Sequence, residues 1–499
     1  MHDANHLISR LSAKGQPSSL FASRPGRSDV TYRALFEGAE QIAAALKQAG
    51  MQPGDRIAAQ VEKSLEAIQL YLGTVMAGGV FLPLNTAYTG PEVSYFLLDA
   101  TPSIVVCDPK RFDEISALSG RACVFTLDAD GHGTLSSAAA AQDAGFTAIP
   151  RGADDLAAIL YTSGTTGRSK GAMLSHQNLA SNSETLRDLW RFTDQDILIH
   201  ALPIFHTHGL FVATNVTLLA GASVHFLSKF DAPAILEAMP TCTALMGVPT
   251  FYTRLLDEPG LDARSVSNMR LFVSGSAPLL VDTHEKWKAR TGHRILERYG
   301  MTETNMNTSN PYCGDRRAGT VGHPLPGVDL RIVRGDTQVD TDEIGVIEVR
   351  GPNVFQGYWK MPEKTAEELR PDGWFFTGDQ GFVDQHGYVT IVGREKDMII
   401  SGGFNVYPKE VEALIDDIPG ITESAVIGVP HPDLGEAVIA VVVLEDSAVT
   451  EATIASALSN QLARFKKPKQ TLFLPELPRN TMGKVQKKAL RETYAGLFV

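Results

Sequence analysis

The sequence contains few cysteines and no long run of hydrophobic residues. Its four cysteines are irregularly spaced and form no Cys-x-x-Cys pair. This spacing argues against a disulfide scaffold and against structural zinc, and it favours a reducing compartment. No segment approaches the roughly 18 apolar residues of a membrane span, and the first residues show no secretory signal pattern. We therefore expect a cytoplasmic protein with no membrane partner.

Positive charge is also in the minority, with 45 Lys and Arg against 57 Asp and Glu and a formal net charge of −12. Such a chain repels polyanions, so nucleic acid is not an expected partner. An anionic ligand would need locally concentrated positive charge. Lys and Arg gather between Arg464 and Arg491, either as a solvated surface or as a lid that faces phosphate.

Short apolar segments alternate with helix-period segments in the first part of the chain. Ile57–Val61, Val80–Leu84 and Ile104–Cys107 are typical of buried strands, and Ser64–Ala77 is typical of a helix. This alternation predicts an α/β fold with doubly wound sheets.

A chain of 499 residues is too long for one ordinary core, so two or more domains are expected. From about Val346 the sequence becomes rich in strands, and a turn near 393–396 leads into a new section. We predict a large N-terminal domain at 1–393, which includes a β-subdomain, and a small, mobile α+β lid domain at 394–499.

The most specific motif is TSGTTGRSKG at Thr162–Gly171, directly after the predicted strand Leu156–Tyr161. Its glycines let backbone N–H groups approach an anion, its hydroxyls add donors, and Arg168 and Lys170 add charge. A plain surface loop is the alternative, but the string favours phosphate. The candidate ligands are Thr162, Ser163, Gly164, Thr165, Thr166, Gly167 and Lys170.

This loop resembles the signature loop of the adenylate-forming superfamily, which includes acyl-CoA synthetases and luciferases, although Ser169 stands where proline is usual. Tyr299-Gly300-Met301-Thr302-Glu303 resembles the YGxTE motif of the same family. The resemblance implies that Tyr299 stacks on adenine and that Thr302 contacts the α-phosphate. Glu303, together with Thr165, would hold Mg²⁺ through hard oxygen ligands.

Further motifs follow in the order that the family shows. Gly275-Ser276-Ala277 resembles the segment at the adenine edge, and Asp379 resembles the carboxylate that accepts from both ribose hydroxyls. Arg394 would add a second ribose or phosphate contact. As isolated residues, Asp379 and Arg394 would more often be surface charges, and the ordered series is what favours the site.

Lys484 lies in a PRNTMGK segment that resembles the C-terminal catalytic motif of the family. The resemblance implies that its ammonium bridges the acyl carboxylate and the α-phosphate during adenylation. It also places a hinge at Lys396. Rotation there would move Lys484 out and bring in Gly402 and Gly403, past which the pantetheine arm of CoA would run.

The residue before Tyr299 is Arg298, where coumarate-type ligases and luciferases usually have glycine. An arginine in a small apolar pocket is costly unless an anion pairs with it, which points to a second carboxylate on the substrate. The alternative is that Arg298 pairs with Glu297 or another acid. Arg254 would complete a clamp, or it is an ordinary charge on a helix surface.

The segments Pro203–Gly209 and Glu297–Pro311 resemble malonyl-CoA synthetases. The resemblance implies ATP-dependent ligation of malonate, or of methylmalonate, to coenzyme A through a malonyl-adenylate, with AMP and pyrophosphate released. His206 would form a pocket wall, and Thr207 and Met306 would act as gatekeepers. The pair His206 and His208 lacks an evident third ligand, so we do not expect a metal there.

Three other hypotheses remain at this stage: a ligase for acetate or another short acid, an adenylation domain that loads a carrier protein, and an inactive acyl-nucleotide binder. Arg298 argues against the first, the absence of a carrier domain before Val499 against the second, and retention of Lys484, Asp379 and Glu303 against the third. A protein acetyltransferase acting on Lys484 is a further possible partner. The oligomeric state is left open.

Overall fold

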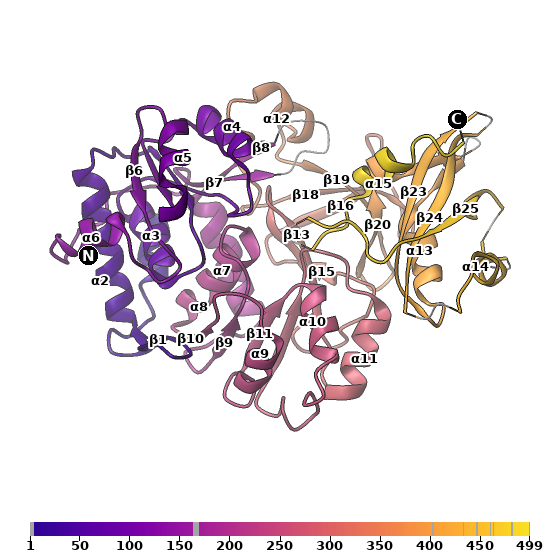
Figure 1. The fold of residues 1–499 in the computed structure, drawn as a ribbon, viewed down its shortest axis with the longest axis horizontal. Helices are drawn as coiled ribbons and strands as arrows, with labels where there is room; N and C mark the ends of the chain where they lie inside the picture. The colour runs from indigo at the N-terminus through magenta and orange to yellow at the C-terminus, as the bar shows by residue number, and fades with distance from the viewer. Residues whose placement is uncertain are drawn as a thin grey trace.

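The computed structural model describes residues 4–162, 169–401, 404–432, 434–445, 448–459, 461–462, 464–480 and 483–498. Three sheets and their helices form a large N-terminal part, and a fourth sheet forms a smaller C-terminal part at the other end of the molecule (Figure 1). This arrangement confirms the expected α/β fold class. Within the described ranges, no helix is both long and apolar enough to cross a membrane.

The first sheet has six strands in the order β6-β5-β3-β4-β7-β8, parallel except for β8. The strands are β3 (Arg56–Gln60), β4 (Val80–Pro83), β5 (Ile104–Cys107), β6 (Cys123–Thr126), β7 (Leu156–Thr162) and β8 (Lys170–Ser175). Three of them coincide with the predicted apolar segments, because parallel strands covered on both faces need continuous apolar runs. Helix α3 (Leu65–Met76) begins after Ser64, whose side chain caps it by accepting from the Ala67 N–H.

The second sheet has nine strands in the order β15-β14-β13-β12-β11-β9-β10-β1-β2. They are β1 (Leu20–Ser23), β2 (Val30–Thr31), β9 (Ile197–His200), β10 (Ser223–Phe226), β11 (Ala244–Gly247), β12 (Leu271–Ser274), β13 (Leu296–Met301), β14 (Asn305–Ser309) and β15 (His323–Pro324). Strand β14 runs antiparallel to β13, so the chain reverses at residues 302–304. One continuous hydrophobic core joins this sheet to the first.

Helices surround these two sheets (Figure 1). They are α1 (His6–Leu11), α2 (Tyr32–Gln48), α4 (Gly90–Ala100), η1 (Pro109–Arg111), α5 (Phe112–Leu118), α6 (Thr134–Ala140), α7 (His176–Leu189), η2 (His208–Thr214), α8 (Asn215–Ala220), α9 (Ala232–Ala238), α10 (Pro249–Leu256) and α11 (Val281–Thr291). Element η2 is a π-helix, a rare widened turn that is often found at functional sites.

The third sheet is the predicted β-subdomain, antiparallel in the order β17-β16-β18-β19-β20. Its elements are β16 (Asp329–Arg334), β17 (Thr337–Gln338), β18 (Gly345–Arg350), β19 (Phe375–Val383), β20 (Val389–Arg394) and helix α12 (Pro362–Glu368). Strand β20 ends at Arg394 and the first strand of the C-terminal sheet begins at Ile399. Residues 395–398 therefore join the sheet of the β-subdomain to the C-terminal sheet. The domain limits at 393 and 394 stay a prediction.

The C-terminal part is built on a sheet with the order β22-β21-β24-β23, and β25 pairs with β24. The joining residues form η3 (Glu395–Asp397), and the elements that follow are β21 (Ile399–Ser401), β22 (Phe404–Val406), α13 (Pro408–Asp416), β23 (Ile421–His431), β24 (Gly435–Leu444), α14 (Glu451–Leu458), η4 (Arg464–Lys466), β25 (Gln470–Phe473) and α15 (Lys487–Tyr494). Successive residues of β24, such as Val438 and Ile439, belong to two different hydrophobic clusters. Both faces of this sheet are therefore covered.

Candidate active site

Two neighbouring side chains of strand β13, Arg298 and Tyr299, lie on opposite sides of the candidate site. Arg298 and Tyr299 follow one another in a strand, so they point to opposite faces. At Gly300 a Cβ would lie 1.9 Å from the backbone oxygen of Asn305. Only glycine therefore allows β14 to return this close to β13.

Tyr299, Asp379 and Arg394 meet on one side. The Tyr299 hydroxyl donates to Asp379 Oδ2 at 2.6 Å, and Arg394 Nε lies 2.6 Å from Asp379 Oδ1. Asp379 and Arg394 are paired across β19 and β20, which explains why residues distant in sequence are in contact. Each carboxylate oxygen can accept two hydrogen bonds, so Asp379 retains capacity for the hydroxyls of a ligand.

Glu303 lies buried in the turn after β13. Its Oε1 is 3.0 Å from the Tyr358 hydroxyl, and burial raises the pKa of its carboxyl group. Thr302 is half-buried in the same turn. Lys170 at the start of β8 forms an ion pair with Glu368 of α12, with Nζ 3.1 Å from Oε1.

Arg298 lies buried on the other side of β13 against Gly275. A Cβ on Gly275 would lie 2.4 Å from Arg298 Cζ, so a side chain at this position would force the guanidinium to move. Burial lowers the pKa of Arg298 to about 9. Burial, with the nearby charges of Arg298 and Lys484, also lowers the pKa of His206 to about 4, which leaves this imidazole neutral near pH 7.

Several buried polar atoms of Arg298, of the 206–208 segment whose histidines lie within range of its charge, and of Ser274 have no hydrogen-bond partner among the described residues. They are Arg298 Nε and Nη2, Thr207 Oγ1, His208 Nε2 and Ser274 Oγ. Glu297, the alternative partner of Arg298, instead accepts from the Leu279 N–H at 3.1 Å. Buried polar groups are normally satisfied, so such a cluster suits a polar or anionic guest.

Three further residues predicted for the site, Ser276, Ala277 and Met306, lie on neighbouring segments. Ser276 has a left-handed backbone with φ of 73°, and its hydroxyl is 3.4 Å from His208 Nδ1. Ala277 follows in the same half-buried segment. Met306 is buried on β14 opposite Gly300. Its role as a gatekeeper stays a prediction.

Arg254 is not brought together with Arg298. Helix α10 buries Phe251, Tyr252 and Leu255, so Arg254 faces outward, exposed, with its guanidinium 5.6 Å from the centre of the Phe230 ring. The structure thus shows no contact between the two arginines among the described residues, and the two-arginine clamp stays a prediction. The helical period that turns Tyr252 towards Arg298 turns Arg254 away.

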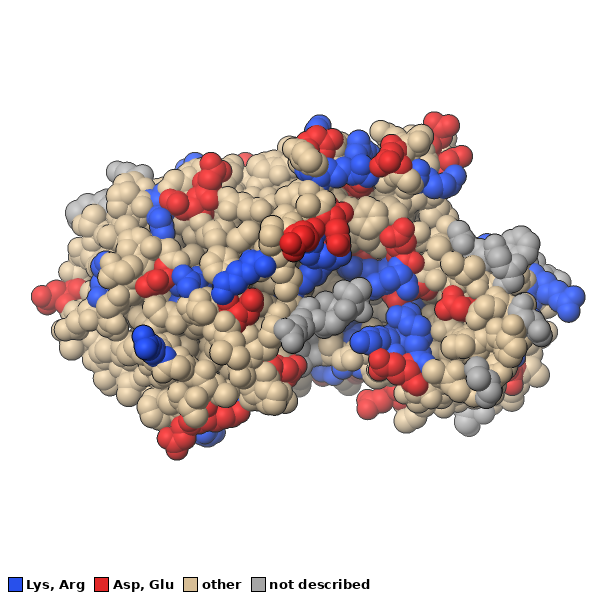
Figure 2. Space-filling view, turned by 90° about the horizontal axis from the view of Figure 1, so that it is seen from above, with Lys and Arg blue, Asp and Glu red and all other residues tan. Residues whose placement is uncertain are grey.

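Lys484 approaches the site from the C-terminal part. A Cβ on the preceding Gly483 would lie 3.8 Å from Thr250 Oγ1 of α10, so this loop contacts the large part. Desolvation and the charge of Arg394 lower the pKa of Lys484, while Asp379 and Glu303 oppose this shift. Lys396 lies in η3 between the two parts, where burial and Arg394 lower its pKa to about 8. Figure 2 shows Lys and Arg side chains gathered along the junction.

Some predicted residues lie outside the described ranges: Ser163, Gly164, Thr165, Thr166, Gly167, Gly402 and Gly403. The two ends of the loop are described. Thr162 ends β7, with its hydroxyl 3.5 Å from the Lys170 carbonyl oxygen, and the Tyr95 hydroxyl donates to the Ser169 carbonyl at 2.8 Å.

Comparison with known families accounts for this arrangement. Residues 10–359 match the model of the AMP-binding enzyme family, and residues 410–484 match the model of its C-terminal domain. The chain belongs to the AMP-binding enzyme family. The confirmed superfamily resemblance explains why Tyr299, Asp379, Arg394 and Lys484 converge from four separate segments.

Relatives within the AMP-binding enzymes act on different acids. The chain is 36% identical to a malonate–CoA ligase of Arabidopsis thaliana, over 89% of this chain and 79% of that protein. It is 37% identical to an indoleacetate–CoA ligase of Aromatoleum aromaticum, over 94% of each. At this level of identity the family alone does not define the acid.

Solved structures of MatB from Rhodopseudomonas palustris are more similar, at 59% identity and with complete coverage of both chains. The TM-score is 0.98 to the ATP-bound form and 0.86 to the apo form. Identity is the same in both comparisons, so the scores differ because the three-dimensional arrangements differ. This AMP-binding enzyme has the arrangement of the ATP-bound form.

The sequence motifs missed several residues that the structure adds to the site of this AMP-binding enzyme. Tyr358 and Glu368 join Glu303 to Lys170 at the phosphate end. Lys63 and His200 form a buried network behind the π-helix η2. Lys63 lies between Glu62 and Ser64, so no sequence signal pointed to the second pair.

Proposed function

We propose that this chain is an AMP-forming acid–thiol ligase that joins malonate to coenzyme A through a malonyl-adenylate. The observation that carries the choice of acid is the buried Arg298, whose Nε and Nη2 lack partners beside the unpartnered Thr207 hydroxyl and His208 Nε2. A second carboxylate on the substrate would satisfy these groups. The similarity to malonate–CoA ligase and to MatB supports the same acid.

In the first half-reaction, the reacting carboxylate of malonate attacks the α-phosphorus of ATP in line, and pyrophosphate leaves. Lys484 would neutralise the charge that develops between carboxylate and α-phosphate, and Thr302 would donate to the α-phosphate. Tyr299 would stack on adenine, with Gly275, Ser276 and Ala277 at its edge. Asp379 and Arg394 would hold the ribose.

Glu303 fits a role in holding Mg²⁺, because it is a buried carboxylate at the phosphate end of the site. Mg²⁺ is usually bound through one or two carboxylates together with substrate phosphates. We propose Glu303 and the Thr165 hydroxyl as its protein ligands. The ion would supply charge neutralisation on the phosphates when bound.

In the second half-reaction, the CoA thiol attacks the mixed anhydride and releases AMP. The thiol would have to reach the anhydride at the place where Lys484 is proposed to act. We therefore propose that the C-terminal part first rotates, with Lys396 as the hinge. Gly402 and Gly403 would then line the path of the pantetheine arm.

Selectivity for malonate follows from charge. Two unit charges about 4 Å apart interact by roughly 4 kcal/mol at an effective dielectric of about 20. Acetate would leave Arg298 unpaired, and sites of this kind reject such analogues by roughly 10⁴-fold. Methylmalonate differs by one methyl group, worth about 1–3 kcal/mol, and Thr207 and Met306 would decide how well it is accepted.

The test is ATP–pyrophosphate exchange with malonate, methylmalonate, succinate and acetate on the native protein, Arg298→Ala and Arg254→Ala. We expect native activity to be highest with malonate, lost in Arg298→Ala and retained in Arg254→Ala. Equal turnover of acetate and malonate by the native protein would favour the short-acid alternative. Release of an adenylate that only a carrier protein can accept would favour a loading domain.

We also infer a cytoplasmic location from the cysteine pattern, and regulation by an acetyltransferase. Acetylation of Lys484 would remove its charge, abolish adenylation and spare thioester formation from preformed malonyl-AMP. Full pyrophosphate exchange by protein acetylated at Lys484 would refute this regulation.

A further inference from the structure

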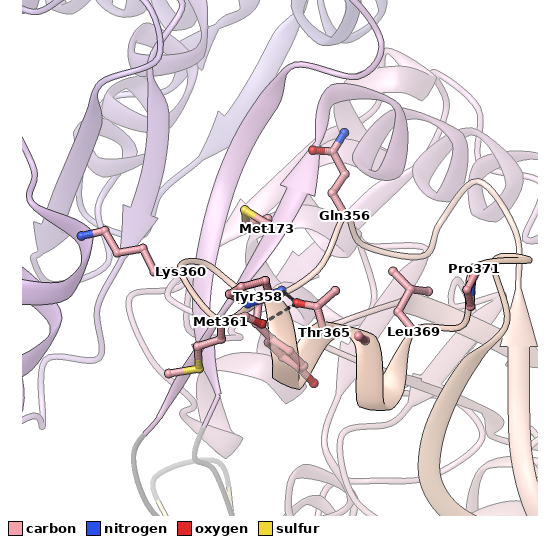
Figure 3. Close-up of a pocket in the computed structure, with 10 residues that line it drawn as sticks. Met173, Gln356, Tyr358, Lys360, Met361, Thr365, Leu369 and Pro371 are labelled. Carbon is pink, nitrogen blue, oxygen red and sulfur yellow. Dashed lines mark hydrogen bonds between the residues drawn. The ribbon is translucent and has the colours of Figure 1, made fainter.

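Helix α12 lies next to the phosphate end of the site but contains none of the motifs assigned to it. Together with residues before and after it, α12 lines a cleft of about 520 Å³ that also includes Met173 of β8 and Tyr358. Figure 3 shows Tyr358 at the centre of this group, where its backbone N–H donates to Thr365 Oγ1 at 2.9 Å. The middle of α12 is thereby attached to Tyr358.

Glu368, the last residue of α12, is linked to two residues of the ATP site. Lys170 Nζ lies 3.1 Å from Glu368 Oε1 and 3.3 Å from Oε2, and it also sits 4.1 Å from the centre of the Tyr358 ring. The Tyr358 hydroxyl donates to Glu368 Oε2 at 2.5 Å and lies 3.0 Å from Glu303 Oε1. One carboxylate thus connects the candidate phosphate-binding lysine with the candidate metal-binding carboxylate.

Burial distinguishes this ion pair from ordinary surface pairs. The side chains of Lys170 and Glu368 are 16% and 19% exposed, whereas Glu367, the preceding residue on the same helix, is 62% exposed. Glu367 pairs only with Lys364 among the described ion pairs. Partly buried ion pairs with good geometry fix side chains more firmly than exposed ones.

Lys170 can bind Glu368 and a second anion at the same time. An ammonium group has three N–H donors, and two of them are sufficient for the two Glu368 oxygens. One donor is left for another anion. We propose that Glu368 is a positioning residue of the ATP site: it holds the Lys170 ammonium in place for the ATP phosphates.

This inference rests on the proposed function, because it requires that Lys170 serves ATP. The experiment compares Glu368→Gln with Glu367→Gln, which removes the same charge from the same helix without touching Lys170. For each, the KM values for ATP and malonate are measured by pyrophosphate exchange, and thioester formation is measured separately from preformed malonyl-AMP.

We expect Glu368→Gln to raise the KM for ATP by about tenfold, with less than about a twofold change in the KM for malonate and in thioester formation. Glu367→Gln should match the native protein. In a Lys170→Gln background, Glu368→Gln should have little further effect on the KM for ATP, since the residue it positions is already absent.

Equal ATP kinetics in Glu368→Gln and Glu367→Gln, or additive effects with Lys170→Gln, would overturn the proposal. If Glu368→Gln folds poorly, Glu368→Asp keeps the charge but withdraws it by one methylene, and it should raise the KM for ATP without lowering the melting temperature. A native protein that shows no malonate-dependent exchange would refute the proposed function instead, so the two failures are distinguishable.

Discussion

At the scale of single residues, burial pushes neighbouring charges on β13 towards their neutral forms. It raises the pKa of Glu297 to about 7 and lowers that of Arg298 to about 9. The two side chains point to opposite faces of the strand, so they do not compensate one another. Glu297 accepts from the Leu279 N–H, whereas Arg298 Nε and Nη2 have no hydrogen-bond partner among the described residues.

Glu297 predicts a specific pH dependence of stability. Its folded pKa lies above its unfolded value, so the folded state binds the extra proton between about pH 4.5 and pH 7. This site therefore costs stability progressively as pH rises through that window, by about 3 kcal/mol in total. Glu297→Gln should gain thermal stability relative to the native protein between pH 5 and pH 8, as measured by melting temperature. The exposed Glu37→Gln serves as the control, and a constant difference across the range would refute the account.

Gly275 predicts a separate effect on malonate. An added methyl group would lie 2.4 Å from Arg298 Cζ, so Gly275→Ala should displace the guanidinium. We expect the KM for malonate to rise by roughly tenfold or more, since even small misplacements of positioning groups are costly. The KM for ATP, measured in the same assay, should change much less. Equal increases in both would mean that Gly275 serves the nucleotide side.

At the scale of elements, the π-helix η2 follows directly after His206 and Thr207 of the predicted pocket wall, and buried side chains contact it from behind. Lys63 Nζ is 3.0 Å from His200 Nδ1 and donates to the carbonyls of His200 and Leu227 at 2.7 and 2.8 Å. Since Nδ1 accepts, the opposite nitrogen of His200 carries the proton and donates to the Gly209 carbonyl at 3.0 Å. This chain of contacts reaches η2 next to His208.

Replacing Lys63 by methionine should therefore disturb η2. Two buried carbonyls would lose their donor, and we expect a loss of about 2 kcal/mol in the free energy of unfolding. The KM for malonate should rise more than that for ATP, because η2 adjoins His206 and Thr207. Chemical denaturation and pyrophosphate exchange would measure both effects. Lys110→Met, at an exposed site, is the control, and identical behaviour of the two variants would contradict this role.

At the scale of the whole molecule, the two parts meet in the arrangement of ATP-bound MatB, with Lys484 close enough for Asp379 and Glu303 to act on its pKa. This arrangement suits adenylation. In the proposed mechanism, thioester formation would use a different arrangement, because the CoA thiol would enter where Lys484 now lies.

Lys396→Pro tests whether the two half-reactions use different arrangements of the two parts. Proline fixes its own φ and removes a backbone donor, which should restrict rotation between β20 and β21. We expect pyrophosphate exchange to remain within a few-fold of native and overall malonyl-CoA formation to fall by more than roughly tenfold. Lys396→Ala should retain both activities. Equal losses in both half-reactions of Lys396→Pro would argue against a hinge at this residue.

The sequence alone determined the features that depend on local order along the chain. Continuous apolar runs predicted β3, β4 and β5, and the ordered motifs identified the family through residues such as Tyr299 and Asp379. Arg298 drew attention because of its place directly before Tyr299. Each of these signals is carried by neighbours in sequence.

Only the tertiary structure decided how distant residues combine. It turned Arg254 outward on α10, left Arg298 as the buried arginine of the pocket, and brought Glu368 to Lys170 across 198 positions of the chain. Hydrogen bonds and ion pairs require contact within a few ångströms, and the path of the chain between two residues determines that contact. Composition and spacing do not contain this information, because it arises only when the sheets and helices pack.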